Sequence, residues 1–401
     1  MKFRFKAMMI PFVLTFLLIG CSASNIETNP IDDKGELKDI NLSETQAKAS
    51  EGEIETASDN DQSNVDQSQE SSLESNPAEG SSEQLSDQAK EETKGTMIDY
   101  QTVKPDESKE IMVIMYHNLS DKNSEYGRTI ESFKQDLERL YNMGFRTISM
   151  NDYLNNNITT EAGFTPVVLT FDDGHATNFK YLDQNGELVV DPDSVVGILD
   201  EFALKHPDFG RHAIFFLNYG NAFGQSEYLE NKLNYLLDNG YEIGNHAYSH
   251  EDLSTLDSKG IQTALGKNAS LYHQINSEIS MSVLALPYGK RPKDEALRTI
   301  VQAGVYEGYS YINEGILLVG WRPTYPVYHI KFDKTAINRV QSGDGEMQLT
   351  WWLDQYEKTP SKRFISDGNP DRISVPARFS DQVDANIVGD KDLYFYELET
   401  E

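Results

Sequence analysis

The chain of 401 residues carries 65 acidic and 35 basic side chains, a formal net charge of −30. A chain this acidic repels phosphate groups, which argues against nucleic acid as a partner. Its single cysteine, Cys21, excludes an intramolecular disulfide, so the folded part must be stabilised by its hydrophobic core.

The first 21 residues have the pattern of a bacterial lipoprotein signal peptide. Basic residues at positions 2, 4 and 6 precede an apolar run at 7–19, which is too short to span a membrane and is followed by Gly20 and Cys21. A cysteine directly after the predicted cleavage site resembles a lipobox, in which that cysteine is lipidated. We therefore predict that Cys21 anchors the protein to the outer face of the cell membrane. The alternative is a secretory signal with an incidental cysteine.

Residues 22–110 are predicted to form a disordered acidic tether. They contain 7 lysines and 23 acidic residues, a net charge of −16, and their first aromatic residue is Tyr100. Such a segment cannot bury enough apolar surface to fold. We expect it to carry the folded domain away from the membrane.

From Ile111 onward, apolar runs typical of buried strands alternate with amphipathic helical patterns. Strands are expected at 111–116, 145–148, 167–171, 212–217, 241–243 and 283–286, and helices at 133–144, from 149, and at 191–202, 228–240, 258–279 and 292–304. This alternation predicts parallel strands with crossover helices. Residues 111–340 fit one barrel-like β/α domain, with a polar insertion at 186–191.

Residues 341–401 are predicted to form a small β-rich C-terminal appendage. They include Trp351-Trp352 and the apolar stretches 373–375 and 393–396. Exposed tryptophans can stack on sugar rings, but paired aromatic residues are more often buried.

Two adjacent carboxylates follow the expected strand at 167–171, in the sequence Thr170-Phe171-Asp172-Asp173-Gly174. Open α/β sheets and barrels place their chemistry at this edge of the strands. Because neighbouring side chains cannot point the same way, one carboxylate can bind a cation while the other accepts a proton. The structural alternative is an ordinary solvated turn.

Two histidines, His246 and His250, follow the expected strand at 241–243. If the segment turns helically, a spacing of four puts both imidazoles on one face. Two histidines and one carboxylate, with water in the open position, are a recurrent catalytic zinc arrangement.

The ordered motifs at 170–174, 246–250 and Leu286-Pro287-Tyr288-Gly289 resemble those of the polysaccharide deacetylases, the NodB-homology enzymes of carbohydrate esterase family 4. The resemblance covers about residues 111–340. It implies a distorted β/α barrel and a hydrolase that removes N-acetyl groups from a cell-surface polysaccharide, either an N-acetylglucosamine-containing exopolysaccharide or peptidoglycan. It also implies a divalent metal, Zn²⁺ or another ion such as Co²⁺ or Ni²⁺, bound by Asp173, His246 and His250.

Amide hydrolysis needs a nucleophilic water, a base, charge stabilisation for the oxyanion and an acid for the leaving amine. The resemblance implies that Asp172 is the base. It also implies that the backbone N–H of Tyr288, in the turn after Pro287, is an oxyanion donor. Bound Zn²⁺ would acidify the water and polarise the acetyl carbonyl.

Two features of the family are absent. Many members begin the third motif with an arginine that orients the catalytic aspartate, and the aligned residue here is Ala285. The fifth motif, Leu-x-Leu-x-His, lacks its histidine in the segment 317–321. Two other histidines are therefore candidates for the general acid. His117 stands at the end of the first strand, whereas the setting of His329 is equally typical of a surface strand.

Two other functions fit the same motifs. A degenerate deacetylase could hold glycan without cleaving it, and an O-acetyl esterase could act on acetylated polysaccharide with the same metal. The presence of all three implied metal ligands and of the base favours an enzyme. The predicted lipid and tether favour a polymer at the cell surface, and we expect a monomer.

Overall fold

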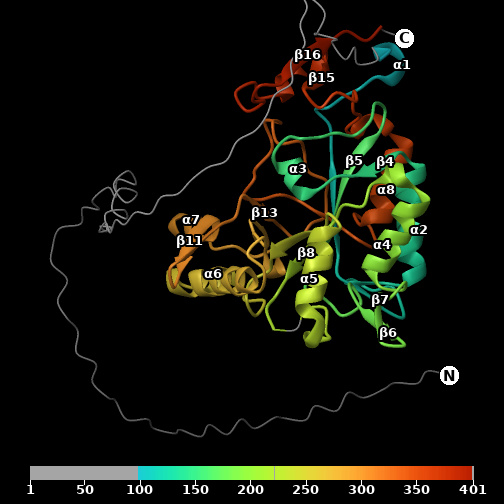
Figure 1. Ribbon diagram of the computed structural model, residues 1–401. Helices are drawn as coiled ribbons and strands as arrows, with labels where there is room; N and C mark the ends of the chain where they lie inside the picture. The colour runs from blue at the N-terminus through green and yellow to red at the C-terminus, as the bar shows by residue number, and fades with distance from the viewer. Residues whose placement is uncertain (1–97, 221, 400–401) are drawn as a thin grey trace, which may run out of the picture. The chain divides into compact units, whose positions relative to one another are not determined.

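The computed structural model describes residues 98–220 and 222–399. Within them a parallel sheet is covered by helices, with two-stranded sheets at its margins (Figure 1). The predicted signal peptide, Cys21 and the tether up to residue 97 lie outside these residues. In the part of the chain that the structure describes, no helix is long and apolar enough to cross a membrane.

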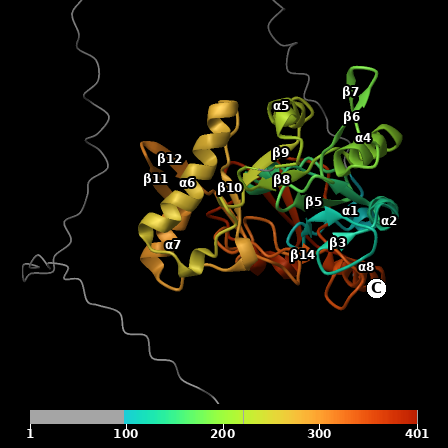
Figure 2. The same ribbon diagram turned by 90° about the horizontal axis from the view of Figure 1, so that it is seen from below.

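The main sheet is parallel throughout and curls into an open half-barrel (Figure 2). Its order is β13, β10, β9, β8, β5, β1 and β14, and β4 pairs with the first half of β5. The carboxyl ends of its strands therefore meet at one edge. This is the distorted β/α barrel that the resemblance implies, so the predicted fold class is confirmed. The strands are β1 (Met112–Tyr116), β4 (Phe145–Thr147), β5 (Thr165–Phe171), β8 (Ile214–Leu217), β9 (Glu242–Asn245), β10 (Val283–Ala285), β13 (Gly315–Leu317) and β14 (Val340–Gln341).

Helices connect most of the strands, and the side chains of the sheet alternate between two apolar clusters. In β1, Met112, Ile114 and Tyr116 join one cluster while Val113 joins the other. Several helices begin at a serine, threonine or aspartate that accepts a backbone N–H of the first turn. The helices are α2 (Ile130–Asn142), α3 (Met150–Leu154), α4 (Val195–Lys205), α5 (Leu229–Asp238), α6 (Ser258–Ile275) and α7 (Glu295–Gln302).

Three further strand pairs differ from or refine the expected pattern. The polar insertion is a hairpin of β6 (Tyr181–Gln184) and β7 (Glu187–Val190), whose Asn-Gly turn has positive φ at both residues. The predicted helix 292–304 starts later, at its cap Asp294, and gives way to a hairpin of β11 (Ala303–Tyr306) and β12 (Tyr309–Ile312). The short strands β2 (Asn118–Leu119) and β3 (Gly127–Arg128) pair beyond the end of β1.

The segment after residue 340 holds more helix than expected. α8 (Leu349–Lys358) buries Leu349, Leu353 and Tyr356 in the main apolar cluster, because these residues have helical spacing. The β-structure in this segment is a parallel pair, β15 (Arg372–Pro376) and β16 (Asp392–Tyr396).

The end of the predicted tether is folded, which corrects the expectation for residues 98–110. After α1 (Tyr100–Val103), Asp106 bridges to Ile365 and the buried Glu107 accepts hydrogen bonds from the C-terminal segment. Contacts with residues more than 250 positions away stabilise this polar stretch, and its composition does not reveal them. α1 and β15–β16 lie at the top of Figure 1, at the end opposite the β6–β7 hairpin, which follows the carboxyl end of β5.

Candidate active site

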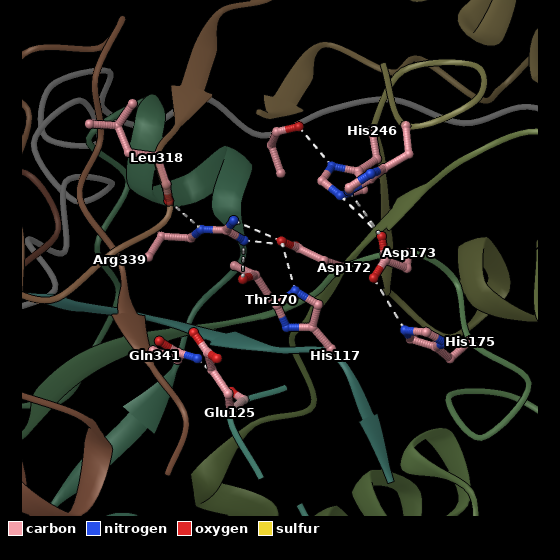
Figure 3. Close-up of polar contacts among 12 residues, drawn as sticks. His117, Glu125, Thr170, Asp172, Asp173, His175, His246, Leu318, Arg339 and Gln341 are labelled. Carbon is pink, nitrogen blue, oxygen red and sulfur yellow. Dashed lines mark hydrogen bonds and ion pairs between the residues drawn. The ribbon is translucent and has the colours of Figure 1, made fainter. Parts of the chain in front are cut away.

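The structure brings Asp173, His246 and His250 together at the carboxyl edge of the sheet. Figure 3 shows Asp173 facing His246. The Asp173 Oδ1 atom lies 3.3 Å from His246 Nε2 and 3.5 Å from His250 Nε2. One ligand atom from each residue falls within 4.8 Å of the others, a group that could hold a metal ion. Asp173 follows β5 and His246 follows β9, so two strands of the sheet position the cluster.

A loop, not a helix, brings the two histidines together. The backbone of Ala247 and His250 is left-handed, with φ of 60° and 57°, so the expectation of one helical face is wrong. Asp173 is also left-handed, with φ of 71°. Such conformations cost non-glycine residues roughly 1–3 kcal/mol each and persist where the surrounding structure holds them. Here Asn218 Nδ2 donates to the carbonyls of His246 and Ala247 at 2.5 and 3.0 Å.

The hydrogen bonding of His246 fits a metal ligand. Its Nδ1 atom lies 2.7 Å from the carbonyl oxygen of Ala285, which can only accept. Nδ1 therefore carries the proton, and the lone pair of Nε2 faces Asp173. Ala285, where the family's arginine is absent, thus orients His246 through its backbone. Two imidazole nitrogens and one carboxylate oxygen match the donor set of a catalytic Zn²⁺ site.

Asp172 is held by an arginine that sequence reasoning missed, Arg339, which directly precedes β14. Arg339 Nη1 and Nη2 donate to the two oxygens of Asp172, each at 2.7 Å (Figure 3). The same guanidinium donates to Thr170 Oγ1 at 3.1 Å and to the carbonyl of Leu318 at 2.8 Å. Arg339 is 0 % exposed and Asp172 2 %. One signal was available: an arginine directly before the apolar Val340 of a buried strand needs a buried carboxylate.

This pairing decides the charge of Asp172. Burial by itself would raise the pKa of the carboxyl group, but the charges of Arg339 and His246 outweigh it, so the pKa is lowered. The pKa of Asp173 is lowered too, because the neighbouring side chains of His175 and His246 outweigh the effect of its burial. His175 Nε2 lies 3.2 Å from Asp173 Oδ2, the carboxylate oxygen that faces away from the other two histidines.

Of the two candidate acids, the structure places His117 in the site. His117 Nε2 lies 3.9 Å from Asp172 Oδ2. Asn178 Nδ2 donates to the His117 carbonyl at 2.7 Å, which fixes the backbone there. Burial lowers the pKa of His117, although the charges of Asp172 and Asp173 oppose the shift.

The structure does not bring His329 to this cluster. Its ring stacks on Tyr325 at 4.1 Å, its Nδ1 accepts from the N–H of Lys331, and its backbone bridges to Val383. Burial lowers the pKa of His329 to about 4, so it is neutral near pH 7. These contacts are typical of a packed structural histidine.

The turn Pro287–Gly289 lies beside the cluster, as the motif implies. Pro287 is buried, and Tyr288 has φ of 58° and an exposed ring that meets the ring of His250 at 4.5 Å. A Cβ at Gly289 would lie 2.8 Å from Val319 Cβ, so the turn fits closely against the segment after β13.

Residues 160–308 match the family model described as polysaccharide deacetylase. The matched span carries Asp172, the three residues of the metal-binding cluster and Tyr288, whereas His117 and Arg339 lie outside it. The chain therefore contains a segment of the polysaccharide deacetylase type. No curated protein sequence matches the chain.

Among solved structures, the chain is similar to the deacetylase PplD of Streptococcus pyogenes, with 15 % identity, 62 % of this chain and 98 % of that chain covered, and a TM-score of 0.46. It is also similar to IcaB of Ammonifex degensii, with 17 % identity and a TM-score of 0.41. The match covers 62 % of this chain and 97 % of that chain. A third similar structure is the peptidoglycan deacetylase PdaC of Bacillus subtilis, with 24 % identity and a TM-score of 0.24. The match covers 34 % of this chain and 55 % of that chain.

Proposed function

We propose that this protein is a metal-dependent hydrolase that removes N-acetyl groups from a cell-surface polysaccharide. The proposal rests on one observation: two adjacent carboxylates have different partners. Asp173 meets two histidine nitrogens, and its neighbour Asp172 is held by Arg339 and lies 3.9 Å from His117. A metal ligand and a proton acceptor therefore stand side by side.

Asp173, His246 and His250 would hold the metal. When bound, Zn²⁺ or a similar ion supplies Lewis acidity at the acetyl carbonyl and lowers the pKa of the attacking water. The match to the polysaccharide deacetylase model covers all three of these residues.

The chain's own residues would perform the proton transfers. Asp172 is kept ionised by Arg339 and keeps lone pairs beyond the two that Arg339 engages, so it can accept the proton of the attacking water. His117 lies 3.9 Å from Asp172 and, in its protonated form, would donate a proton to the nitrogen as the carbon–nitrogen bond breaks, which releases acetate and an amine. The Tyr288 N–H would face the oxyanion.

The direct test measures metal and acetate together on the full mature chain. We expect stoichiometric divalent metal, and acetate release from at least one of chitooligosaccharide, peptidoglycan and poly-N-acetylglucosamine. His246→Ala should lose both, whereas His273→Ala, on α6 outside the cluster, should lose neither. A His246→Ala protein that keeps its metal and activity would contradict the proposal.

The same assay separates the alternatives. Acetate released only from O-acetylated xylan would make the protein an esterase. Bound metal without acetate release from any polymer would indicate a glycan-binding module.

We further propose that Cys21 is diacylated and holds the protein on the outer face of the membrane. The support is the sequence Leu18-Ile19-Gly20-Cys21 after a short apolar run. One acyl chain gives marginal attachment and two give stable attachment. Cys21→Ser should release the protein from the membrane fraction or leave it unprocessed, and an unchanged membrane fraction would rule the anchor out.

A further inference from the structure

The proposed function does not use Tyr126, although its exposed ring lies beside the site. Tyr126 is 46 % exposed, and its ring meets the ring of His117 edge-on, with centroids 4.8 Å apart. His117 in turn lies 3.9 Å from the Asp172 carboxylate. The rigid, amphipathic ring of Tyr126 is therefore separated from the predicted base, Asp172, by one side chain, that of His117.

Tyr126 belongs to residues 118–128, here called the Tyr126 loop, and the ends of this loop are closed by the β2–β3 pair. The loop is tightly packed within itself. The Ser124 N–H donates to the Gly127 carbonyl at 2.8 Å, and a Cβ at Gly127 would lie 2.4 Å from Ser120 Oγ. The backbone on either side of Tyr126 is therefore held in place.

Polar contacts fix the Tyr126 loop to the rest of the domain. Arg128 is buried, and its guanidinium donates to Asp136 on α2 at 2.6 and 3.0 Å and to Asp344 at 2.9 Å. Asn123 Nδ2 also donates to Asp344, at 3.1 Å. The Gln341 side chain, at the end of β14, donates to the Glu125 carbonyl (Figure 3).

These contacts connect the loop to the strand that begins beside Arg339. An exposed ring held by a buried Arg128–Asp136 pair is preorganised, and preorganisation lowers the entropic cost of binding a ligand. The Tyr126 ring thus has the properties of a contact for substrate.

A second exposed tyrosine, Tyr288, lies beside the Asp173 half of the carboxylate pair. The Tyr288 ring meets His250, and His250 meets Asp173. Figure 3 shows His117 and His246 on opposite sides of the Asp172–Asp173 pair. A sugar chain laid across the two carboxylates would therefore meet one tyrosine ring before them and another after them.

We propose, on the basis of the deacetylase function above, that Tyr126 is the stacking surface for a pyranose ring next to the sugar whose acetamide is cleaved, on its His117 side. Aromatic faces provide large apolar contact at little cost in conformational entropy and suit the C–H face of a pyranose. Contacts on both sides of the reacting sugar favour residues inside a polymer over single sugars or chain ends.

The test compares Tyr126→Ala, Tyr126→Phe and Tyr394→Ala on N-acetylglucosamine oligomers of two to six sugars. Tyr394 is a matched control, because it is 43 % exposed on β16, at the other end of the domain. Tyr126→Ala should lower kcat/KM for the longer oligomers by about tenfold, mainly through KM, and less for the disaccharide. Tyr126→Phe keeps the ring and should stay near wild type.

Two kinetic outcomes would overturn the subsite. If Tyr126→Ala lowers kcat/KM equally for oligomers of every length, Tyr126 only supports His117. If Tyr126→Ala behaves like Tyr394→Ala, Tyr126 has no role in binding substrate. Calorimetry with the pentasaccharide on Asp172→Asn protein separates this proposal from the proposed function. One outcome is that the wild-type protein cleaves no oligomer, but Tyr126→Ala still weakens pentasaccharide binding to the Asp172→Asn protein. In that case Tyr126 binds sugar and the deacetylase function is wrong. If the oligomer is neither bound nor cleaved, the subsite falls as well.

Discussion

Asp172 and Glu107 are two buried carboxyl groups at opposite ends of β1, and they have opposite electrostatic settings. The Asp172 N–H donates to the carbonyl of Tyr116, the last residue of β1, whereas Glu107 precedes the strand. The exposed fractions of the two residues are 2 % and 4 %. Burial alone would disfavour the charged form of both.

Their partners differ. Arg339 donates two hydrogen bonds to Asp172, and the pKa of Asp172 is lowered. Glu107 accepts from the backbone N–H groups of Asp367 and Ser374, and burial together with the charge of Asp367 raises its pKa to about 8. In these two groups the presence or absence of a hydrogen-bonded cation, and not the depth of burial, sets the direction of the pKa shift. Of these two groups, only Asp172 is ionised at neutral pH and can therefore accept a proton.

Removing that cation should have the largest effect. Arg339→Met leaves Asp172 buried without its partner, which typically costs about 3–5 kcal/mol, and we expect acetate release to fall about a hundredfold or more. Denaturant unfolding and the acetate assay measure the two losses. Arg322→Ala, at an exposed arginine, is the control and should change neither. An Arg339→Met protein with wild-type stability would show that the pair does not act as described.

Asp172→Asn tests the same pair from the other side. We expect metal to be retained while acetate release falls about a hundredfold or more, the usual scale for a general base. The double variant Asp172→Asn/Arg339→Met should be more stable than Arg339→Met alone, because neither an uncompensated carboxylate nor an uncompensated guanidinium remains. Loss of metal from Asp172→Asn would instead make Asp172 a ligand.

Glu107 should make stability depend on pH. Its folded pKa of about 8 lies above the ordinary value of 4.5, so the folded protein keeps a proton that the unfolded chain releases. The stabilisation is therefore complete below pH 4.5 and is lost as pH rises through 8, by about 2–5 kcal/mol in all.

Glu107→Gln should flatten this slope. Denaturant midpoints measured from pH 5 to pH 9 test the difference, with Glu131→Gln, at an exposed residue of α2, as the control. Parallel curves for wild type and Glu107→Gln would mean that Glu107 titrates normally.

The smallest effect is expected at an exposed ion pair near the site. Lys290 Nζ lies 2.8 Å from Asp252 Oδ2, within 0.1 Å of the two 2.7 Å bonds in the Arg339 pair, but the Lys290 side chain is 58 % exposed. Because solvent screens such a pair, Lys290→Ala should change acetate release by less than about twofold and leave the unfolding midpoint unchanged. A large loss would show that short ion pairs matter here regardless of burial.

Much of the barrel follows from local patterns in the sequence. The apolar runs at 111–116 and 167–171 became β1 and β5, and the Asp172–Asp173 pair lies at the carboxyl edge of β5 as expected. The spacing of His246 and His250 predicted one shared site, but not the way in which the two side chains meet. A loop with left-handed residues brings them together, and not a helical turn. Residue spacing does not show which residues have a left-handed backbone, because the contacts that hold this backbone come from elsewhere in the chain.

The sequence by itself determined the strand–helix alternation and the adjacency of Asp172 and Asp173, because both depend on residues a few positions apart. Only the tertiary structure decided the partners of the buried charges. Arg339 reaches Asp172 across 167 positions, and Glu107 reaches Ser374 across 267. A buried carboxyl group takes whichever donor the fold brings to it, and neither burial nor donor can be read from its neighbours in the chain.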